Sequence, residues 1–82
     1  MNNSFINIGY GNMVAAGKIL AIVHPEPAPI RRLIAEHKAS GKIIDATAGR
    51  RTRAVLISNG EYIILSSLQP ETIANRLQEV SP

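Results

Sequence analysis

The sequence predicts a small α+β domain in which two helices pack on a largely antiparallel sheet. Three observations lead to this fold class. Short runs rich in β-branched residues recur, an Asn59-Gly60 pair separates two of them, and proline precedes two segments with apolar residues at helical spacing. The predicted order of elements is β-β-α-β-β-β-α. The 82 residues are enough for one domain, which we assign to residues 1–82.

The first half of the chain is predicted to supply two strands. Phe5–Ile8 is expected to form a short strand, and Gly9–Asn12 the turn that follows it. Met13–Val23 has the apolar content of a longer strand, but Gly17 and Lys18 interrupt it, which is typical of a β-bulge.

Both helices are predicted from a proline at the start and apolar residues at helical spacing. Pro29 suits the first turn of a helix, and Gly41 suits its C-terminal stop. The apolar stripe of this helix is expected to comprise Ile30, Leu33, Ile34 and His37. A short strand is expected over 42–48, and the last helix over 70–80, with Pro70 as its first residue.

The Asn59-Gly60 pair predicts a β-hairpin with a two-residue type I′ turn, because that turn needs positive φ at both central residues. This loop would place Ile57 opposite Tyr62 and Val55 opposite Ile64. Both faces of the hairpin are apolar in sequence. We therefore expect the two helices to cover one face and another subunit to cover the second.

Composition excludes several classes of protein. The chain has no cysteine, so it can form neither a disulfide nor a thiolate metal site. Its start lacks the basic and apolar regions of a signal peptide, and its longest apolar stretch, Ile19–Val23, is too short to cross a bilayer. These features predict a soluble, cytoplasmic protein without a membrane partner.

No catalytic or metal constellation is evident in the sequence. His24 and Glu26 form an H-x-E pair, but the cysteine pair that zinc deaminases place beside such a motif is missing. His24 and His37 alone do not make a metal site. We predict that the protein is not an enzyme and has no metal, cofactor or small-molecule substrate.

Basic residues concentrate in one stretch of the chain. The net charge is +3, and every Lys and Arg except Arg76 lies between Lys18 and Arg53. The string DATAGRRTRAV, residues 45–55, holds three arginines, Arg50, Arg51 and Arg53. The planar arginine fork suits phosphate oxygens, so this distribution indicates an anionic partner.

Within this string, Arg53 is expected to begin the hairpin strand. Arg51 would then share a side with Arg53, whereas Arg50 and Thr52 would point the other way, and Thr52 could add a phosphate contact. The alternative is a solvated turn with one arginine paired to Asp45. The absence of acids between residues 46 and 60 argues against that alternative.

Three further cations are candidates for the same partner. We expect phosphate contact mainly from Arg50, Arg51 and Lys18, with Arg53 and Thr52 supporting, whereas Arg31 and Arg32 are weaker candidates. Lys18 stands alone in an apolar strand, where its structural alternative is a residue that discourages edge pairing. Arg31 and Arg32 lie on the predicted first helix, where their alternative is simply a solvated helix surface.

Four strings, NIGYGN, AIVHPEPAPIRRLI, IDATAGRRTRAV and ILSSLQPETIANRL, resemble the RemA-type extracellular matrix regulatory proteins, from about residue 6 to residue 77. The resemblance implies a small bacterial DNA-binding protein of the nucleoid. Such proteins activate biofilm matrix genes and assemble into ring-shaped homo-oligomers. Their DNA-contacting arginines correspond to Arg50 and Arg51, with Arg53 in the same string. Lys18 stands where the family often has arginine, and it supplies a point charge there.

Together these observations predict a non-enzymatic, sequence-preferring, double-stranded DNA-binding transcriptional regulator that acts as a ring through an arginine-rich rim. Two alternatives remain open. The chain could bind RNA, although one phenylalanine and two tyrosines offer few stacking platforms for single strands. It could also be a structural or protein-binding ring whose basic rim meets an acidic protein.

Overall fold

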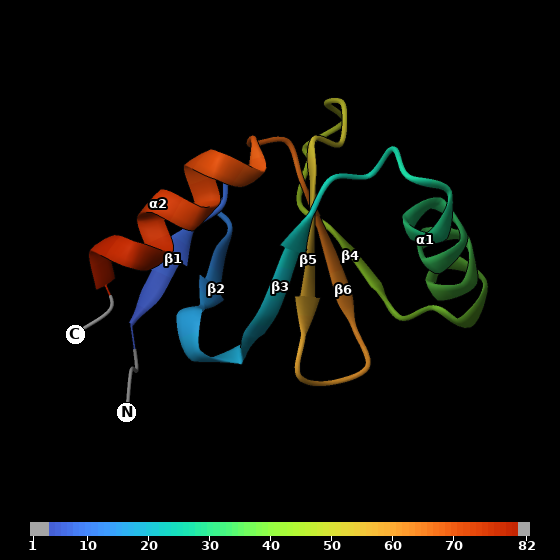
Figure 1. The fold of residues 1–82 in the computed structure, drawn as a ribbon, viewed down its shortest axis with the longest axis horizontal. Coiled ribbons are helices and arrows are strands. Elements are labelled where there is room, and N and C mark those ends of the chain that lie inside the picture. The colour runs from blue at the N-terminus through green and yellow to red at the C-terminus, as the bar shows by residue number, and fades with distance from the viewer. Residues whose placement is uncertain (1–3, 81–82) are drawn as a thin grey trace.

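The computed structural model describes residues 4–80 and shows a small α+β domain with two helices and mostly antiparallel strands (Figure 1). A single 3-10 turn, Ala16–Lys18, lies between the second and third strands. In chain order the other elements are β1 (Phe5–Asn7), β2 (Met13–Ala15), β3 (Ile19–Val23), α1 (Ala28–Ser40), β4 (Ile43–Asp45), β5 (Ala54–Ser58), β6 (Ile63–Ser66) and α2 (Pro70–Val80).

The strands form two sheets. The larger sheet has the order β3-β5-β6-β4, in which β4 runs parallel to β6 and the other pairs are antiparallel. The smaller sheet is the antiparallel pair β1-β2. In Figure 1, α1 lies on one side of the larger sheet, and α2 lies with β1 and β2 on the other.

The predicted long strand Met13–Val23 is wrong, because the chain leaves one sheet and enters the other within it. The 3-10 turn Ala16–Lys18 makes this change, and Ala16 is buried in the core while its N–H donates to the Ser4 carbonyl (2.9 Å). A bulge does occur, but it lies at Leu20, where two residues of β3 oppose one of β5.

The predicted hairpin register is also wrong, by one residue. Ile57 pairs with Ile63 rather than with Tyr62, and neither Asn59 nor Gly60 has a positive φ. The Ser58 hydroxyl donates to the Tyr62 carbonyl (2.7 Å) and accepts from the Gly60 N–H (3.2 Å). These side-chain bonds stabilise a four-residue loop in place of the type I′ turn. Because the register shifts by one residue, each β6 side chain points to the face of the sheet opposite to the predicted one.

Both faces of the larger sheet are covered within the chain, so the expectation that a second subunit covers one face is wrong. Val55, Ile63 and Leu65 pack against apolar residues of α1. Leu56 and Ile64 point the other way, into a core that includes Ile6 and Ile8 from the β1 region and Ile73 from α2. One helix lies on each face, which is why neither face remains open.

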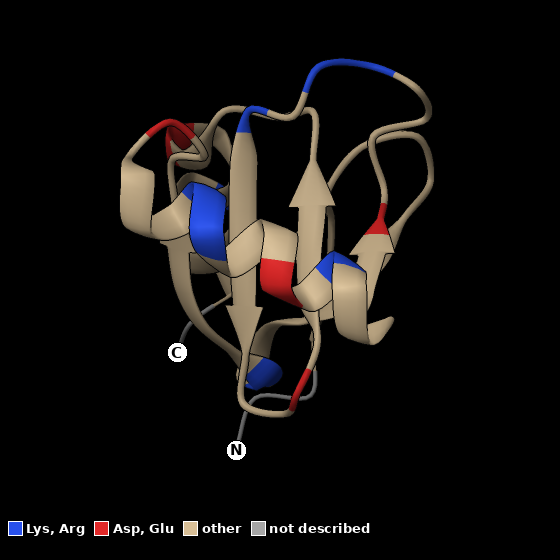
Figure 2. Cartoon of the chain, turned by 90° about the vertical axis from the view of Figure 1, so that its right-hand side faces the viewer, with Lys and Arg blue, Asp and Glu red and all other residues tan. Residues whose placement is uncertain are grey.

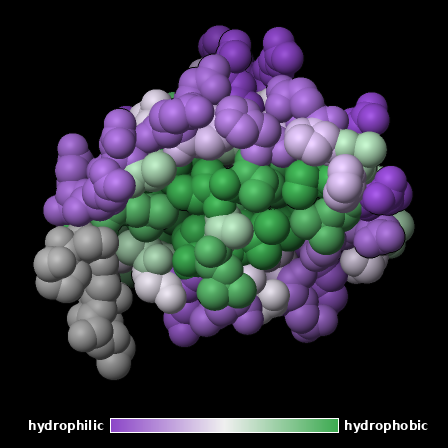
Figure 3. Space-filling model, viewed as in Figure 1, coloured by the Kyte–Doolittle hydropathy of each residue, from purple (hydrophilic) through white to green (hydrophobic). Residues whose placement is uncertain are grey.

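The surfaces left open are instead the sheet edges, because β3 and β4 each pair with only one strand of the larger sheet. Leu20 on β3 is 69% exposed and Ile44 on β4 is 49% exposed. Figure 3 shows a broad band of hydrophobic residues across the face on which β2 and β3 lie in Figure 1. Exposed apolar edges of this kind are typical of surfaces that associate.

The helices follow their predictions closely. The second spans Pro70–Val80 as expected, and the first begins at Ala28, one residue before Pro29. Gly41 ends α1 in the left-handed conformation (φ 72°), with its N–H bonded to the last turn. The expected strand over 42–48 shortens to Ile43–Asp45, and the hairpin strand begins at Ala54 rather than Arg53.

Candidate nucleic-acid interface

The three arginines lie in the arginine loop, residues 46–53, which joins β4 to β5 at one end of the larger sheet. This loop carries Lys or Arg colouring above the sheet in Figure 2. Arg50, Arg51 and Arg53 are all exposed. They line one cavity of about 440 Å³, here called the arginine cavity, together with Gly9, Tyr10, Ser67 and Leu68. The fold therefore gathers all three side chains around one concave, positively charged surface.

Hydrogen bonds fix both ends of the arginine loop. At its start, a carboxylate oxygen of Asp45 accepts from the Thr47 N–H (2.9 Å) and hydroxyl (2.6 Å). The Arg50 N–H donates to the Thr47 carbonyl (3.0 Å). At its end, the Arg53 N–H donates to the Ser66 carbonyl (2.9 Å), which extends the ladder of the β5-β6 pair. The arginine side chains thus project from a restrained backbone.

Asp45 organises the loop through Thr47 rather than through an arginine. The Thr47 side-chain hydrogen bond, followed by the backbone bond, lowers the pKa of the Asp45 carboxyl from its ordinary value. The alternative of a turn with an arginine paired to Asp45 is therefore wrong. Hydrogen bonds from Thr47 stabilise the Asp45 carboxylate, so no arginine is needed to pair with it and the arginines remain available for a partner.

Two successive residues with positive φ reverse the chain inside the arginine loop, Ala48 at 53° and Gly49 at 78°. No atom lies within 4 Å of a Cβ built at Gly49, so conformation rather than space favours glycine there. Because the chain reverses here, the Arg50 N–H comes within 3.0 Å of the Thr47 carbonyl.

The arginines have little acidic compensation. Within residues 4–80, the one ion pair that they form joins Arg51 Nη2 to Glu26 Oε2 at 4.0 Å, and both side chains are exposed. Such a pair is weak in water. Arg50 instead places its guanidinium carbon 5.6 Å from the centre of the Tyr10 ring. Most of the positive charge at the arginine cavity is consequently uncompensated.

The other predicted residues lie outside the arginine cavity. Thr52 is half-buried and does not line it. Arg31 and Arg32 are exposed on α1. Lys18 lies at the opposite end of the larger sheet, where its carbonyl accepts from the Asn59 N–H (2.9 Å). The structure thus brings the three arginines together and separates them from Lys18.

Sequence reasoning missed the contribution of the β1-β2 turn to this site. Gly9–Asn12 was predicted only as a turn, yet Gly9 and Tyr10 line the arginine cavity. The available signal was Tyr10 itself, an aromatic side chain between two glycines in a chain with few aromatic residues. Its proximity to Arg50 depends on tertiary packing, which the local sequence does not report.

Two features are absent from the part of the chain that the structure describes. Between residues 4 and 80, no three His, Cys, Asp or Glu side chains cluster in a way that could hold a metal ion. Within the same range, no helix has the length and apolar content to span a membrane.

Comparison with known proteins decides the family. Residues 5–77 match the RemA-like family model, described as extracellular matrix regulatory protein A-like. The chain belongs to the RemA-like family. Its relatives are named as regulatory proteins, which agrees with a non-enzymatic role.

Relatives of this RemA-like protein occur in several bacteria. One from Geobacillus sp. (strain WCH70) is 61% identical over 77 residues, which cover 94% of this chain and 88% of the relative. Another from Synechococcus sp. (strain JA-2-3B'a(2-13)) is 55% identical over 82 residues, covering 100% and 92%. The family match over residues 5–77 confirms the resemblance carried by the four strings, which runs from about residue 6 to residue 77.

Proposed function

We propose that this RemA-like protein is a sequence-preferring regulator that binds double-stranded DNA and works as a ring-shaped homo-oligomer. The single observation that carries the proposal is the arginine cavity, where three exposed arginines converge with little acidic compensation. Arginine forks bind phosphate oxygens and guanine edges. Following the family description, we propose that its targets include genes for the extracellular matrix.

The fold supports association in a head-to-tail manner. The two open edges of the larger sheet, β3 and β4, are different surfaces, and each carries an exposed apolar residue, Leu20 and Ile44. A contact between the β3 edge of one subunit and the β4 edge of the next is heterologous, and such contacts close into rings when the rotation allows. The arginine loop lies at a strand end, so the ring would repeat it along one rim.

Such a rim would compensate for the small charge of a single subunit. The chain has a net charge of only +3. Each neutralised phosphate contributes about −0.9 to the slope of log affinity against log salt concentration. Repeating the arginine cavity around a ring therefore multiplies the phosphate contacts, and affinity arises from multivalency.

The proposal is tested by a salt titration of binding to AT-rich duplex DNA, measured by fluorescence anisotropy. The wild type is compared with the Arg50→Ala, Arg51→Ala double variant. We expect a steep slope for the wild type and a slope shallower by about 1.8 per contacting subunit for the variant. Absence of binding at low salt, from folded and assembled protein, would overturn the proposal.

The same assay separates the alternatives. Single-stranded RNA and an acidic protein are added as competitors of the labelled duplex. A regulator of double-stranded DNA releases the duplex only at large excess of either competitor. Preferential capture of RNA or of the acidic protein would favour the corresponding alternative. Size-exclusion chromatography of the double variant checks that the arginines are not interface residues, since its elution should match that of the wild type.

The ring is tested by Leu20→Lys. Leu20 is 69% exposed, so the substitution leaves the core of the subunit intact. A lysine on the β3 edge should prevent edge contact and reduce the molar mass measured by light scattering to that of a monomer. The exposed helix substitution Arg32→Ala serves as the matched control and should leave the assembly unchanged. An unchanged mass for Leu20→Lys would contradict the proposed β3 contact.

A further inference from the structure

We infer that the β1-β2 turn is a second component of the DNA interface, in which Tyr10 positions Arg50 so that the arginine cavity takes one backbone phosphate. This inference rests on the proposed function and extends it to a residue far away in sequence. Its starting point is geometric, because Tyr10 lines the arginine cavity while its ring lies 5.6 Å from the Arg50 guanidinium.

The conformation of Tyr10 costs free energy. Its φ of 55° lies in the left-handed region, which a bulky side chain rarely adopts. The flanking glycines are also left-handed, Gly9 at 109° and Gly11 at 77°. A glycine at position 10 would adopt this backbone more easily, yet the position carries an exposed aromatic ring. Strain of this kind persists where the surrounding structure over-determines it, often at binding sites.

The surroundings do determine the turn. The Gly9 N–H donates to the Asn7 side-chain oxygen (2.7 Å), and the Ile8 N–H donates to the Asn12 carbonyl (2.8 Å). The Asn12 side-chain amide donates to the Gly9 carbonyl (2.9 Å) and reaches the Ala46 carbonyl (3.4 Å). The last contact ties the turn directly to the start of the arginine loop.

A second tie is buried. The Ser66 hydroxyl, fully buried, donates to the Ile8 carbonyl (2.8 Å), while the Ser66 carbonyl accepts from the Arg53 N–H (2.9 Å). Gly9 adjoins this junction, since a Cβ built there would lie at an ordinary van der Waals distance of 3.5 Å from Ser67 and Leu68 atoms. The turn and the arginine loop therefore form one rigid unit with the cavity between them.

The chemistry of this cavity suits a phosphodiester. The Tyr10 ring face attracts the Arg50 guanidinium and restricts its rotamers, but it does not neutralise the charge as a carboxylate would. Arg51 and Arg53 add guanidinium donors to the lining of the cavity, and Ser67 also lines it. An arginine that is pre-ordered in this way loses less side-chain entropy when it binds a phosphate oxygen.

The test uses Tyr10→Gly in the full chain, with duplex DNA as the probe. Glycine removes the ring and relieves the left-handed strain, so the thermal midpoint should not fall. The dissociation constant should rise by about two- to fivefold per contacting subunit. The salt slope should stay close to that of the wild type, because Arg50 keeps its charge. Tyr10→Phe, which retains the ring face, should restore most of the affinity.

A matched control lies at the other end of the sheet. Tyr62 packs under Lys42 with a similar separation, 5.5 Å from Nζ to the ring centre, and is likewise exposed. Tyr62→Leu should leave DNA affinity unchanged. If both tyrosine variants weaken binding equally, the effect is general and the inference is overturned.

Positioning is distinguished from direct contact by a double-mutant cycle. If Tyr10 acts through Arg50, Tyr10→Gly should have little further effect in an Arg50→Ala background. Three outcomes would overturn the inference. Tyr10→Gly could reduce DNA affinity equally in both backgrounds, it could leave DNA affinity unchanged, or it could abolish assembly in size-exclusion chromatography. Failure of the wild type to bind the duplex would instead overturn the proposed function, so the two failures are distinguishable.

Discussion

The two ends of the larger sheet present their basic side chains in different ways. At the arginine end, formed by the arginine loop and the β1-β2 turn, Arg50 and Arg53 have no ion pair within residues 4–80. At the hairpin end, formed by the loop between β5 and β6 and its neighbours, Lys42 lies 3.8 Å from a carboxylate oxygen of Glu61 and over the Tyr62 ring.

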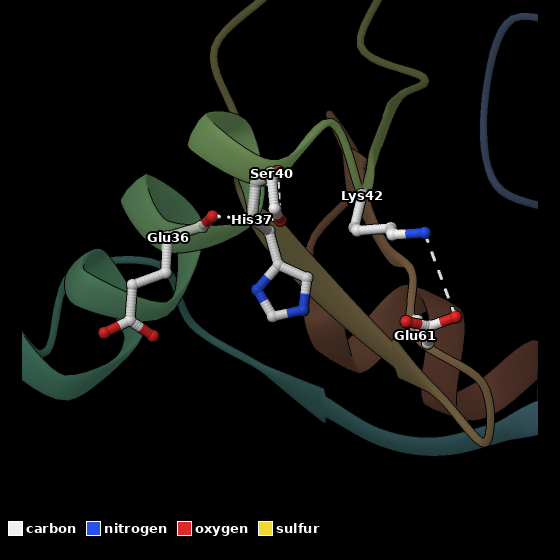
Figure 4. Close-up of polar contacts among 5 residues, drawn as sticks. All are labelled: Glu36, His37, Ser40, Lys42 and Glu61. Atoms are coloured by element: carbon white, nitrogen blue, oxygen red, sulfur yellow. Dashed lines mark hydrogen bonds and ion pairs between the residues drawn. The ribbon is translucent and has the colours of Figure 1, made fainter.

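Figure 4 shows how local the contacts near the hairpin end are. The Lys42 side chain points toward Glu61, while the Ser40 hydroxyl donates to the Glu36 and His37 carbonyls of its own helix (3.1 and 3.3 Å). His37 places Nδ1 2.8 Å from the Leu33 carbonyl, to which it donates. Lys42 thus faces a carboxylate, whereas Arg50 and Arg53 project from a restrained backbone without an ion pair within residues 4–80. Lys42 and the arginines thus differ in how far acidic side chains compensate their charge.

The largest expected difference between the two ends is in the loss of stability when one serine at each end is replaced by alanine. Ser66→Ala at the arginine end removes a buried hydroxyl that bonds the Ile8 carbonyl and the Leu68 N–H (2.8 and 3.1 Å). We expect the free energy of unfolding to fall by about 2 kcal/mol, because the buried Ile8 carbonyl and the partly buried Leu68 N–H both lose their partner. Urea unfolding followed by circular dichroism measures this change.

Ser58→Ala is the matched variant at the hairpin end. Its hydroxyl also makes two hydrogen bonds, but Ser58 is only partly buried and water can replace them. A loss of about 0.5 kcal/mol is expected. Equal losses for the two serines would mean that the arginine end is no more tightly built than the hairpin end.

A smaller effect, with a defined pH dependence, is expected from Thr47→Val. Thr47 is buried and supplies the hydroxyl that lowers the pKa of Asp45. Removing that bond should lower the free energy of unfolding by about 1 kcal/mol at neutral pH. Because the pKa of Asp45 in the folded state lies below its ordinary value, the stabilisation is present above that ordinary value and is lost as pH falls through the folded pKa.

The measurement is urea unfolding of both proteins at about pH 6 and about pH 3. The difference between wild type and Thr47→Val should shrink at the lower pH. Asp45→Asn is the control, since it keeps an acceptor but cannot ionise, and Thr47→Val should have no such pH dependence in that background. A difference that grows on acidification would contradict the assigned role of Asp45.

Elements determined by the backbone preferences of single residues were predicted correctly, whereas elements determined by side-chain hydrogen bonds or tertiary contacts were not. Pro70 and Gly41 act on their own backbone, so both helix assignments were confirmed. The hairpin register depended on bonds from the Ser58 side chain, which compete with the intrinsic turn preference of Asn59–Gly60. The break at Ala16–Lys18 depended on burial of Ala16, which is a tertiary effect.

The candidate site divides in the same way. The arginines are neighbours in sequence, so their cluster could be predicted, and the structure gathers them around one cavity. Tyr10 joins them only because Ser66 and Asn12 bind the two segments together. Lys18 was grouped with the arginines, but antiparallel pairing of β3 with β5 carries it to the other end of the sheet. The relative direction of paired strands determines which end a residue occupies, and local sequence does not encode that pairing.

The smallest expected effect tests whether the hairpin end takes part in binding. In a head-to-tail ring, Lys18 would lie on the rim opposite the arginine loops, away from DNA bound there. Lys18→Ala should therefore change the salt slope of duplex binding by well under the value of about 0.9 expected for one phosphate contact. Fluorescence anisotropy at several salt concentrations measures the slope, with Arg53→Ala as the comparison at the arginine end.

Glu61→Gln tests whether the ion pair with Glu61 prevents Lys42, at the hairpin end, from contacting DNA. This variant frees Lys42 from its 3.8 Å ion pair without altering any arginine. The added point charge should raise non-specific affinity only slightly, because Lys42 remains far from the arginine cavity and lacks a bidentate fork. A slope that steepens by about 0.9 per subunit would mean that DNA reaches both ends of the sheet. Compensation by Glu61, rather than distance, would then explain the difference between the two ends.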